Sequence, residues 1–66
     1  MHIQLNGDPH ECEDDLTVAR LLQRLNLNEK RLAVERNGMI VPRSRFDDQT
    51  LCERDQVEIV RAIGGG

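Results

Sequence analysis

The chain is poor in aromatic residues and has no long apolar stretch. Phe46 is the only one of the 66 residues that is Phe, Trp or Tyr. The chain has nine basic and twelve acidic residues, and the basic residues do not form a run. Such a composition disfavours nucleic-acid binding, which needs clustered cations and stacking platforms. No apolar stretch approaches the roughly 20 residues that span a bilayer, and the first ten residues lack the pattern of a signal peptide. We therefore expect a cytoplasmic protein that binds neither nucleic acid nor membrane.

Serine, histidine and cysteine are too scarce to form an obvious catalytic group. Ser44 is the single serine, and no histidine and carboxylate accompany it in a triad-like pattern. Cys12 and Cys52 have no CxxC spacing, and only His2 and His10 could add nitrogen ligands for a metal. We expect both cysteines to be half-buried small hydrophobic residues, without redox or metal chemistry.

The short length also argues against a self-sufficient enzyme. A chain of this size forms one domain and buries only about 60% of the surface that its unfolded form exposes. Ligand pockets usually occupy about 300 Å³ or more, so little interior remains for a substrate. We expect no catalytic residue, no bound metal and no cofactor held by the chain itself.

The N-terminal residues predict a β-hairpin. Residues 1–5 alternate apolar and polar side chains, as in a strand with one buried face. Asn6 and Gly7 tolerate positive φ and provide a turn. Residues 10–13 then return as the second strand, with His10 and Cys12 on one face and Glu11 and Glu13 on the other.

The next segment predicts an amphipathic helix. Val18, Leu21, Leu22 and Leu25 follow the helical spacing i, i+3, i+4, i+7. Thr17 precedes them as a suitable N-cap. Leu16 and Leu21 could pack together as a hydrophobic staple around that cap. We expect the helix to end near residue 26, where asparagines begin.

A second hairpin and an irregular segment follow. Residues 31–41 predict two strands around an Asn37-Gly38 turn, and the proline that follows ends the second strand because it cannot donate to a ladder. The polar stretch beyond it offers Phe46 and Leu51 as its anchors in the core.

The final apolar stretch, residues 57–63, predicts a last strand that lies centrally, beside the first. The expected architecture is an α+β domain over residues 1–63, with a mixed sheet of four to five strands and one main helix on one face. This element order matches a ubiquitin-like β-grasp. Residues 64–66 are expected to form a flexible tail.

Three glycines in a row at Gly64, Gly65 and Gly66 contribute no packing, so they are either a frayed end or a functional arm. An α-carboxyl group has a pKa of about 3.5 and is ionised at neutral pH. Chemistry on that carboxylate needs prior activation by another enzyme, and glycine lets the backbone enter a narrow channel. Three extended residues would reach about 10 Å beyond the domain. We expect the carboxylate of Gly66 to be the reacting group, with Gly64 and Gly65 needed for access.

The residues nearest this tail are expected to flank the surface on which the activating partner docks. These residues are Val60, Arg61 and Ile63.

Over nearly its whole length the sequence resembles the ThiS-type sulfur carrier family of thiamine biosynthesis. The resemblance rests on the compact length and on three stretches, "LTVARLLQRL", "LAVERNGMIVPRSRF" and "VEIVRAIGGG". Phe46 stands where the family often has Trp or Tyr, and Gly64 where it often has another small residue. The family pattern therefore points to Gly65 and Gly66 as the functional pair.

The resemblance implies a non-catalytic β-grasp protein that acts as a substrate of other enzymes. A ThiF-type adenylyltransferase, related to ubiquitin-activating enzymes, would use Mg-ATP to convert the carboxylate of Gly66 to an acyl adenylate. A persulfide donor would then supply sulfur to give a thiocarboxylate, and thiazole synthase of the ThiG type would take that sulfur into the thiazole phosphate ring.

Three alternatives remain at this level. One is the small subunit of molybdopterin synthase, although such chains tend to be longer and to carry a proline-rich approach to the glycines. The others are a ubiquitin-like modifier that forms isopeptide bonds and an interaction module with an incidental tail. The intact mass of protein isolated from cells would separate these possibilities.

Overall fold

The computed structural model describes residues 1–27 and 29–61, which form a five-stranded mixed sheet and one α-helix. Two short 3₁₀ helices, η1 and η2, precede β3 and follow β4. The elements are β1 (His2–Leu5), β2 (Asp8–Glu11), α1 (Val18–Arg24), η1 (Glu29–Arg31), β3 (Leu32–Arg36), β4 (Met39–Val41), η2 (Arg43–Arg45) and β5 (Gln56–Arg61).

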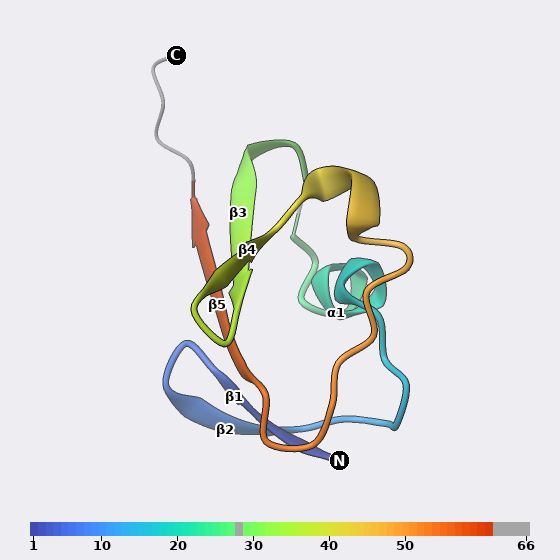
Figure 1. Cartoon of the computed structure of the whole chain (residues 1–66), viewed down its shortest axis with the longest axis vertical. Coiled ribbons are helices and arrows are strands. Elements are labelled where there is room, and N and C mark those ends of the chain that lie inside the picture. The colour runs from blue at the N-terminus through green and yellow to red at the C-terminus, as the bar shows by residue number, and fades with distance from the viewer. Residues whose placement is uncertain (28, 62–66) are drawn as a thin grey trace.

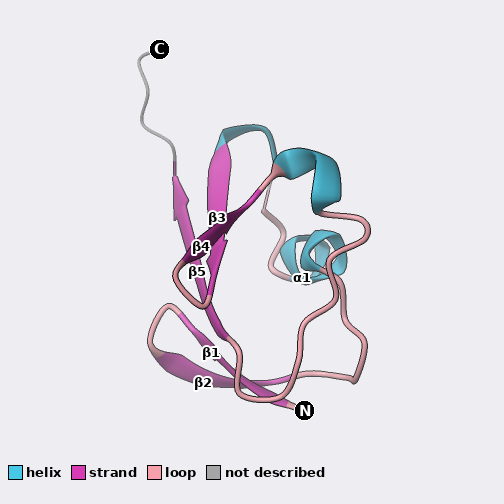
Figure 2. Cartoon of the chain, viewed as in Figure 1, coloured by secondary structure: helices cyan, strands magenta, loops and turns pink. Residues whose placement is uncertain are grey.

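The last strand lies in the middle of the sheet, as the sequence predicts. The strand order is β2-β1-β5-β3-β4, in which β5 runs parallel to β1 and antiparallel to β3. Figure 1 shows α1 on one side of the sheet, and Figure 2 shows that a long loop-rich segment connects β4 back to β5 on the helix side. This arrangement confirms the predicted α+β architecture with one helix on one face.

Both hairpins turn on an Asn-Gly pair with positive φ. Asn6 and Gly7 have φ of 50° and 86°, and Asn37 and Gly38 have φ of 53° and 83°. Paired positive φ values match the twist of the flanking strands in two-residue hairpins.

The second strand begins earlier than predicted. Because the turn uses only two residues, Asp8 already pairs with Leu5 and Pro9 with Gln4. A proline is tolerated there because β2 is an edge strand, which needs ladder bonds on one side only.

Helix α1 has the predicted cap and buried face. The Thr17 hydroxyl accepts a hydrogen bond from the backbone N–H of Arg20 at 3.2 Å. The helix ends at Arg24, and Asn26 follows with φ of 56°, close to the predicted end. The side chains that α1 contributes to the core are Val18, Ala19, Leu21 and Leu22.

The predicted core anchors of the irregular segment are confirmed, because Phe46 and Leu51 are both buried. The short helical turn η2 within this segment was not predicted. The two cysteines differ from the expectation that both are half-buried: Cys12 is buried and Cys52 is exposed.

Strand β5 is less buried than its apolar sequence suggests. Val57 is buried and Ile59 is partly buried against the core, but Val60 is 51% exposed. The reason is that the helix covers one face of the sheet only. The predicted domain boundary at residue 63 lies outside the described residues.

Candidate functional site

The candidate site is the end of β5, from which the chain continues into residues 62–66. Strand β1 pairs with β5 only as far as Val57, whereas β3 pairs with it as far as Arg61. The last residues of β5 therefore extend beyond β1 and have a neighbouring strand on one edge only (Figure 1). The predicted site residues Ile63, Gly64, Gly65 and Gly66 lie outside the described residues.

Asn6 holds the exposed edge of β5 in place. Its side chain accepts a hydrogen bond from the N–H of Ile59 at 2.7 Å and donates one to the carbonyl oxygen of Ile59 at 3.2 Å. Its own N–H donates to the carbonyl oxygen of Val57 at 2.9 Å. Beyond Val57, where the pairing with β1 ends, Asn6 thus provides the hydrogen-bond partners of β5. It pairs with the N–H and the carbonyl oxygen of Ile59 just before the strand ends. Sequence reasoning assigned Asn6 to a turn and missed this second role.

Two of the predicted docking residues lie on opposite faces of the sheet. Val60 lies opposite Ala33 in the ladder between β3 and β5, and Arg61 lies opposite Leu32. Since neighbouring residues of a strand point to opposite faces, and Leu32 faces the helix, Arg61 is on the helix side and Val60 on the outer side. A single flat partner surface cannot cover both side chains.

The outer face carries exposed apolar side chains. Ile40 in β4 is 68% exposed and Val60 in β5 is 51% exposed on this face. Met39 is 74% exposed, but as the strand neighbour of Ile40 it points to the helix side. Between β4 and β5, strand β3 places Ala33 and Glu35 on the outer face. Exposed apolar groups that gather on one face are typical of protein–protein contact sites.

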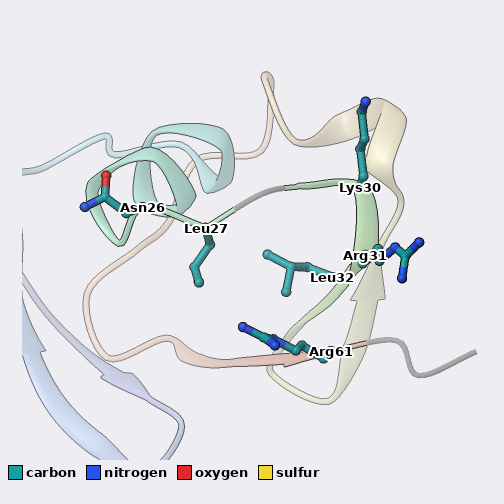
Figure 3. A pocket seen from close by; sticks show the side chains of 6 residues that line it. All are labelled: Asn26, Leu27, Lys30, Arg31, Leu32 and Arg61. Atoms are coloured by element: carbon teal, nitrogen blue, oxygen red, sulfur yellow. The ribbon is translucent and has the colours of Figure 1, made fainter.

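The helix side has an open hollow beside Arg61, with a volume of about 340 Å³. Figure 3 shows Leu32 and Arg61 pointing toward Leu27, while Lys30 and Arg31 project outward at the rim. Its lining residues are Asn26, Leu27, Lys30, Arg31, Leu32 and Arg61. The volume is near the lower end of ligand pockets, although the short chain led us to expect little room for a substrate.

The hollow continues into a smaller apolar one of about 200 Å³. Leucines at its walls come from β1, from the end of α1 and from β3, and Arg61 is shared by both hollows. Its lining residues are Leu5, Asn6, Leu25, Leu27, Leu32, Ile59 and Arg61. Among the side chains that the structure describes, neither set of lining residues includes a carboxylate, a histidine or a cysteine.

A separate polar cluster surrounds the buried carboxylate of Asp55. It accepts hydrogen bonds from Arg36 Nε at 2.6 Å, Asn37 Nδ2 at 3.0 Å and the N–H of Cys52 at 2.8 Å. Burial raises the pKa of this carboxyl, but the hydrogen bonds outweigh burial and hold the pKa below its ordinary value of 3.8. These contacts link the second hairpin to the segment before β5, and sequence reasoning missed them.

The two cysteines are free thiols in the described part of the chain and form no disulfide with each other. Burial raises the pKa of the Cys12 thiol, which keeps that side chain in its neutral form. Cys52 accepts a long hydrogen bond from Arg36 Nη2 at 3.6 Å. Within residues 1–27 and 29–61, no group of three histidine, cysteine or acidic side chains is arranged to hold a metal ion. The expectation that both thiols stay outside the reaction remains a prediction.

No helix in the described part of the chain has the length and apolar content needed to cross a membrane.

Known proteins match this chain in sequence and in fold. The model of the ThiS family matches residues 3–66. The sulfur carrier protein ThiS of Bacillus subtilis strain 168 is 40% identical over 65 residues, which cover 97% of this chain and 98% of that protein. The crystal structure of the thiamine biosynthesis protein ThiS from Geobacter metallireducens superposes with a TM-score of 0.88 at 33% identity, and the alignment covers both chains completely.

A longer relative places a similar sequence within an enzyme. The thiazole synthase of Magnetococcus marinus is 44% identical to this chain over 66 residues, and the chain spans 20% of that protein. The family match over nearly the whole chain, the full-length relatives and the superposed structure agree. The chain therefore belongs to the ThiS family and has its ubiquitin-like β-grasp fold.

Proposed function

We propose that this protein is a sulfur carrier of thiamine biosynthesis in which Gly66 supplies the reacting carboxylate. In this proposal residues 1–63 form the body that partner enzymes recognise, and residues 64–66 form the arm that enters their active sites. Members of the ThiS family are small carriers rather than catalysts.

The proposed chemistry begins with an adenylating enzyme of the ThiF type and Mg-ATP. A carboxylate oxygen of Gly66 attacks the α-phosphorus of ATP, and pyrophosphate leaves. The terminal sulfur of a persulfide then attacks the acyl carbon, and AMP leaves. A thiol supplies the two electrons that cleave the resulting sulfur–sulfur bond, which leaves a thiocarboxylate on Gly66.

The thiocarboxylate would then donate its sulfur to thiazole synthase. The thiazole synthase of Magnetococcus marinus contains a segment similar to this whole chain, which supports a working association between the two kinds of protein. That relative, together with the similarity to the thiamine biosynthesis protein ThiS of Geobacter metallireducens, favours thiamine over molybdopterin synthesis.

The observation that carries the proposal is that the family match extends to residue 66 and so includes all three glycines. The structure supports it, because the central strand β5 leads the chain out of the body at a strand end that β1 does not cover. Glycine in the arm lets the backbone approach a confined active site without a Cβ.

The test is the mass of the protein after incubation with the adenylating enzyme, Mg-ATP and a persulfide donor. The wild-type protein is expected to gain the difference between one sulfur and one oxygen atom. Gly66→Ala and Gly65→Ala are expected to slow this gain by about 100-fold, because a small misplacement of a reacting group has an effect of that size. Gly64→Ala, two residues away from Gly66, is expected to slow the gain less. Arg20→Ala, at an exposed residue of α1 away from the arm, is the control and should be loaded at the rate of wild type.

Three results would contradict the proposal. Undiminished loading of Gly66→Ala would remove the argument for the glycine arm. Protein from cells that carries no sulfur increment under thiamine limitation would contradict the carrier role. Isopeptide conjugates to lysines of other proteins would indicate a modifier instead.

A further inference from the structure

We propose that the hollow beside Arg61 is a docking site for a segment of thiazole synthase in which an acidic side chain adjoins an aliphatic one. The carboxylate would pair with Arg61, and the aliphatic group would occupy the leucine-walled space behind it. This inference rests on the proposed function, since it assumes that thiazole synthase holds the end of β5. Thiazole synthase would then contact the helix side of the sheet at Arg61, in addition to any contact that it makes with the outer face.

Position is the first reason. Arg61 is the last described residue of β5, and its backbone is held in the ladder opposite Leu32. Its side chain therefore leaves the sheet at the point where the chain continues toward the glycines. An enzyme that takes those glycines into its active site must have surface close to this point.

Charge is the second reason. The whole chain has a net charge of −3, yet the hollow is lined by the three cations Lys30, Arg31 and Arg61, and none of the other described side chains in its lining is acidic. Arg61 makes no ion pair with any residue of the described chain, whereas Arg24 and Arg36 pair with carboxylates of the chain itself. The planar guanidinium of arginine matches a carboxylate in a two-bond geometry.

The apolar walls are the third reason, and they favour a protein segment over a small anion. Leu27 and Leu32 line both hollows, and the smaller one adds Leu5, Leu25 and Ile59. Figure 3 shows Leu27 and Leu32 facing each other next to Arg61. An aliphatic side chain can bury this surface, which inorganic phosphate cannot do. Apolar surroundings also strengthen a charge pair, because they lower the local dielectric constant.

The experiment is a titration of the full chain with thiazole synthase at low ionic strength. Arg61→Glu is expected to raise Kd about tenfold or more, because it places like charges together at the contact. Arg61→Lys keeps the charge but loses the two-bond geometry and should give a smaller increase. Arg20→Glu is the matched control: it changes the net charge equally at an exposed residue of α1 and should change Kd less than twofold.

Salt dependence provides a second readout. The Kd of the wild-type chain should rise with salt more steeply than that of Arg61→Glu, because an attractive pair is screened. Equal Kd values and equal salt slopes for Arg61→Glu and Arg20→Glu would overturn the proposal. So would displacement of the partner by inorganic phosphate at constant ionic strength, since the hollow would then be a small-anion site.

The outcome is separable from that of the proposed function. Formation of the thiocarboxylate on the wild-type chain is measured without thiazole synthase, so its failure counts against the carrier role alone. If loading succeeds and Arg61→Glu binds thiazole synthase as tightly as Arg20→Glu, only the docking site is refuted. Matching circular dichroism spectra of all variants show that each of them is folded.

Discussion

At the scale of single residues, the buried carboxylate of Asp55 accepts three hydrogen bonds from other parts of the chain. Asp55 is 5% exposed, and its carboxylate joins Arg36 and Asn37 of the second hairpin to the backbone of Cys52. Asn37 in turn accepts a hydrogen bond from the N–H of Gln56 at 2.8 Å, at the start of β5. A buried charge with this many donors is stabilising only in its ionised form.

Replacement of Asp55 by asparagine should lower the free energy of unfolding by about 2–3 kcal/mol at neutral pH, because hydrogen bonds to a charged group are lost. The native pKa of Asp55 is lowered from 3.8, so its contribution is complete above that unfolded value and is lost as pH falls through the native pKa. Urea unfolding at a series of pH values should therefore show the difference between wild type and Asp55→Asn shrinking below about pH 4.

The control is Asp48→Asn, a change at an exposed carboxylate outside the cluster. It should leave stability within about 0.5 kcal/mol of wild type. A difference between wild type and Asp55→Asn that stays constant down to pH 2 would contradict the assigned role of the ionised carboxylate.

At the scale of elements, α1 is too short to be stable alone. It has seven residues, whereas isolated helices below about 12 residues are marginal in water. Its stability comes from its buried face, from the cap at Thr17, and from the N–H of Val18, which donates to the carbonyl oxygen of Gln49 at 2.9 Å. Thr17 also forms an isolated β-bridge with Thr50, so the cap ties the helix to the loop that leads to β5.

Removal of the cap hydroxyl should therefore have a measurable effect. We expect Thr17→Ala to lower the free energy of unfolding by about 1 kcal/mol, the usual cost of losing an N-cap acceptor. Thr17→Ser keeps the oxygen that accepts from Arg20 and should remain within a few tenths of wild type. Chemical denaturation of the three proteins measures both effects, and equal losses for Ala and Ser would show that the methyl group matters rather than the cap.

At the scale of the whole molecule, the end of β5 presents two different surfaces to a partner. Val60 belongs to the outer face with Ile40, and Arg61 belongs to the helix side with the hollow. The body thus allows a partner to contact both sides of the strand that leads to the glycines. A partner that contacts both sides of β5 would fix the orientation of this strand and so the direction in which it points the glycines.

A double-mutant cycle tests this arrangement. If the partner contacts Val60 and Arg61 with separate groups, the losses in binding free energy to thiazole synthase from Val60→Asp and Arg61→Glu should add within about 0.5 kcal/mol. A coupling clearly larger than this value would mean that both side chains meet one partner group. A Val60→Asp variant with unchanged Kd would show that the outer face takes no part.

Much of the local structure follows from the sequence alone. The two Asn-Gly turns, the helical spacing after Thr17 and the alternation of β1 depend on neighbours within about four residues, which is the range of backbone preference and side-chain periodicity. Phe46 and Leu51 were predictable as anchors because they are the large apolar residues of a polar stretch. The family was also evident from these stretches, whereas the role of the three terminal glycines stays a prediction.

Contacts between residues far apart in the chain came only from the tertiary structure. Strand alternation places Val60 and Arg61 on opposite faces, but only the position of α1 shows which face is covered and which is open. The bond between Arg36 and Asp55 joins residues 19 apart, and the bonds between Asn6 and Ile59 join residues 53 apart. Leu27 has no periodic pattern that marks it as the wall of a hollow. These features depend on how strands are paired and layered, and local preferences do not encode that pairing.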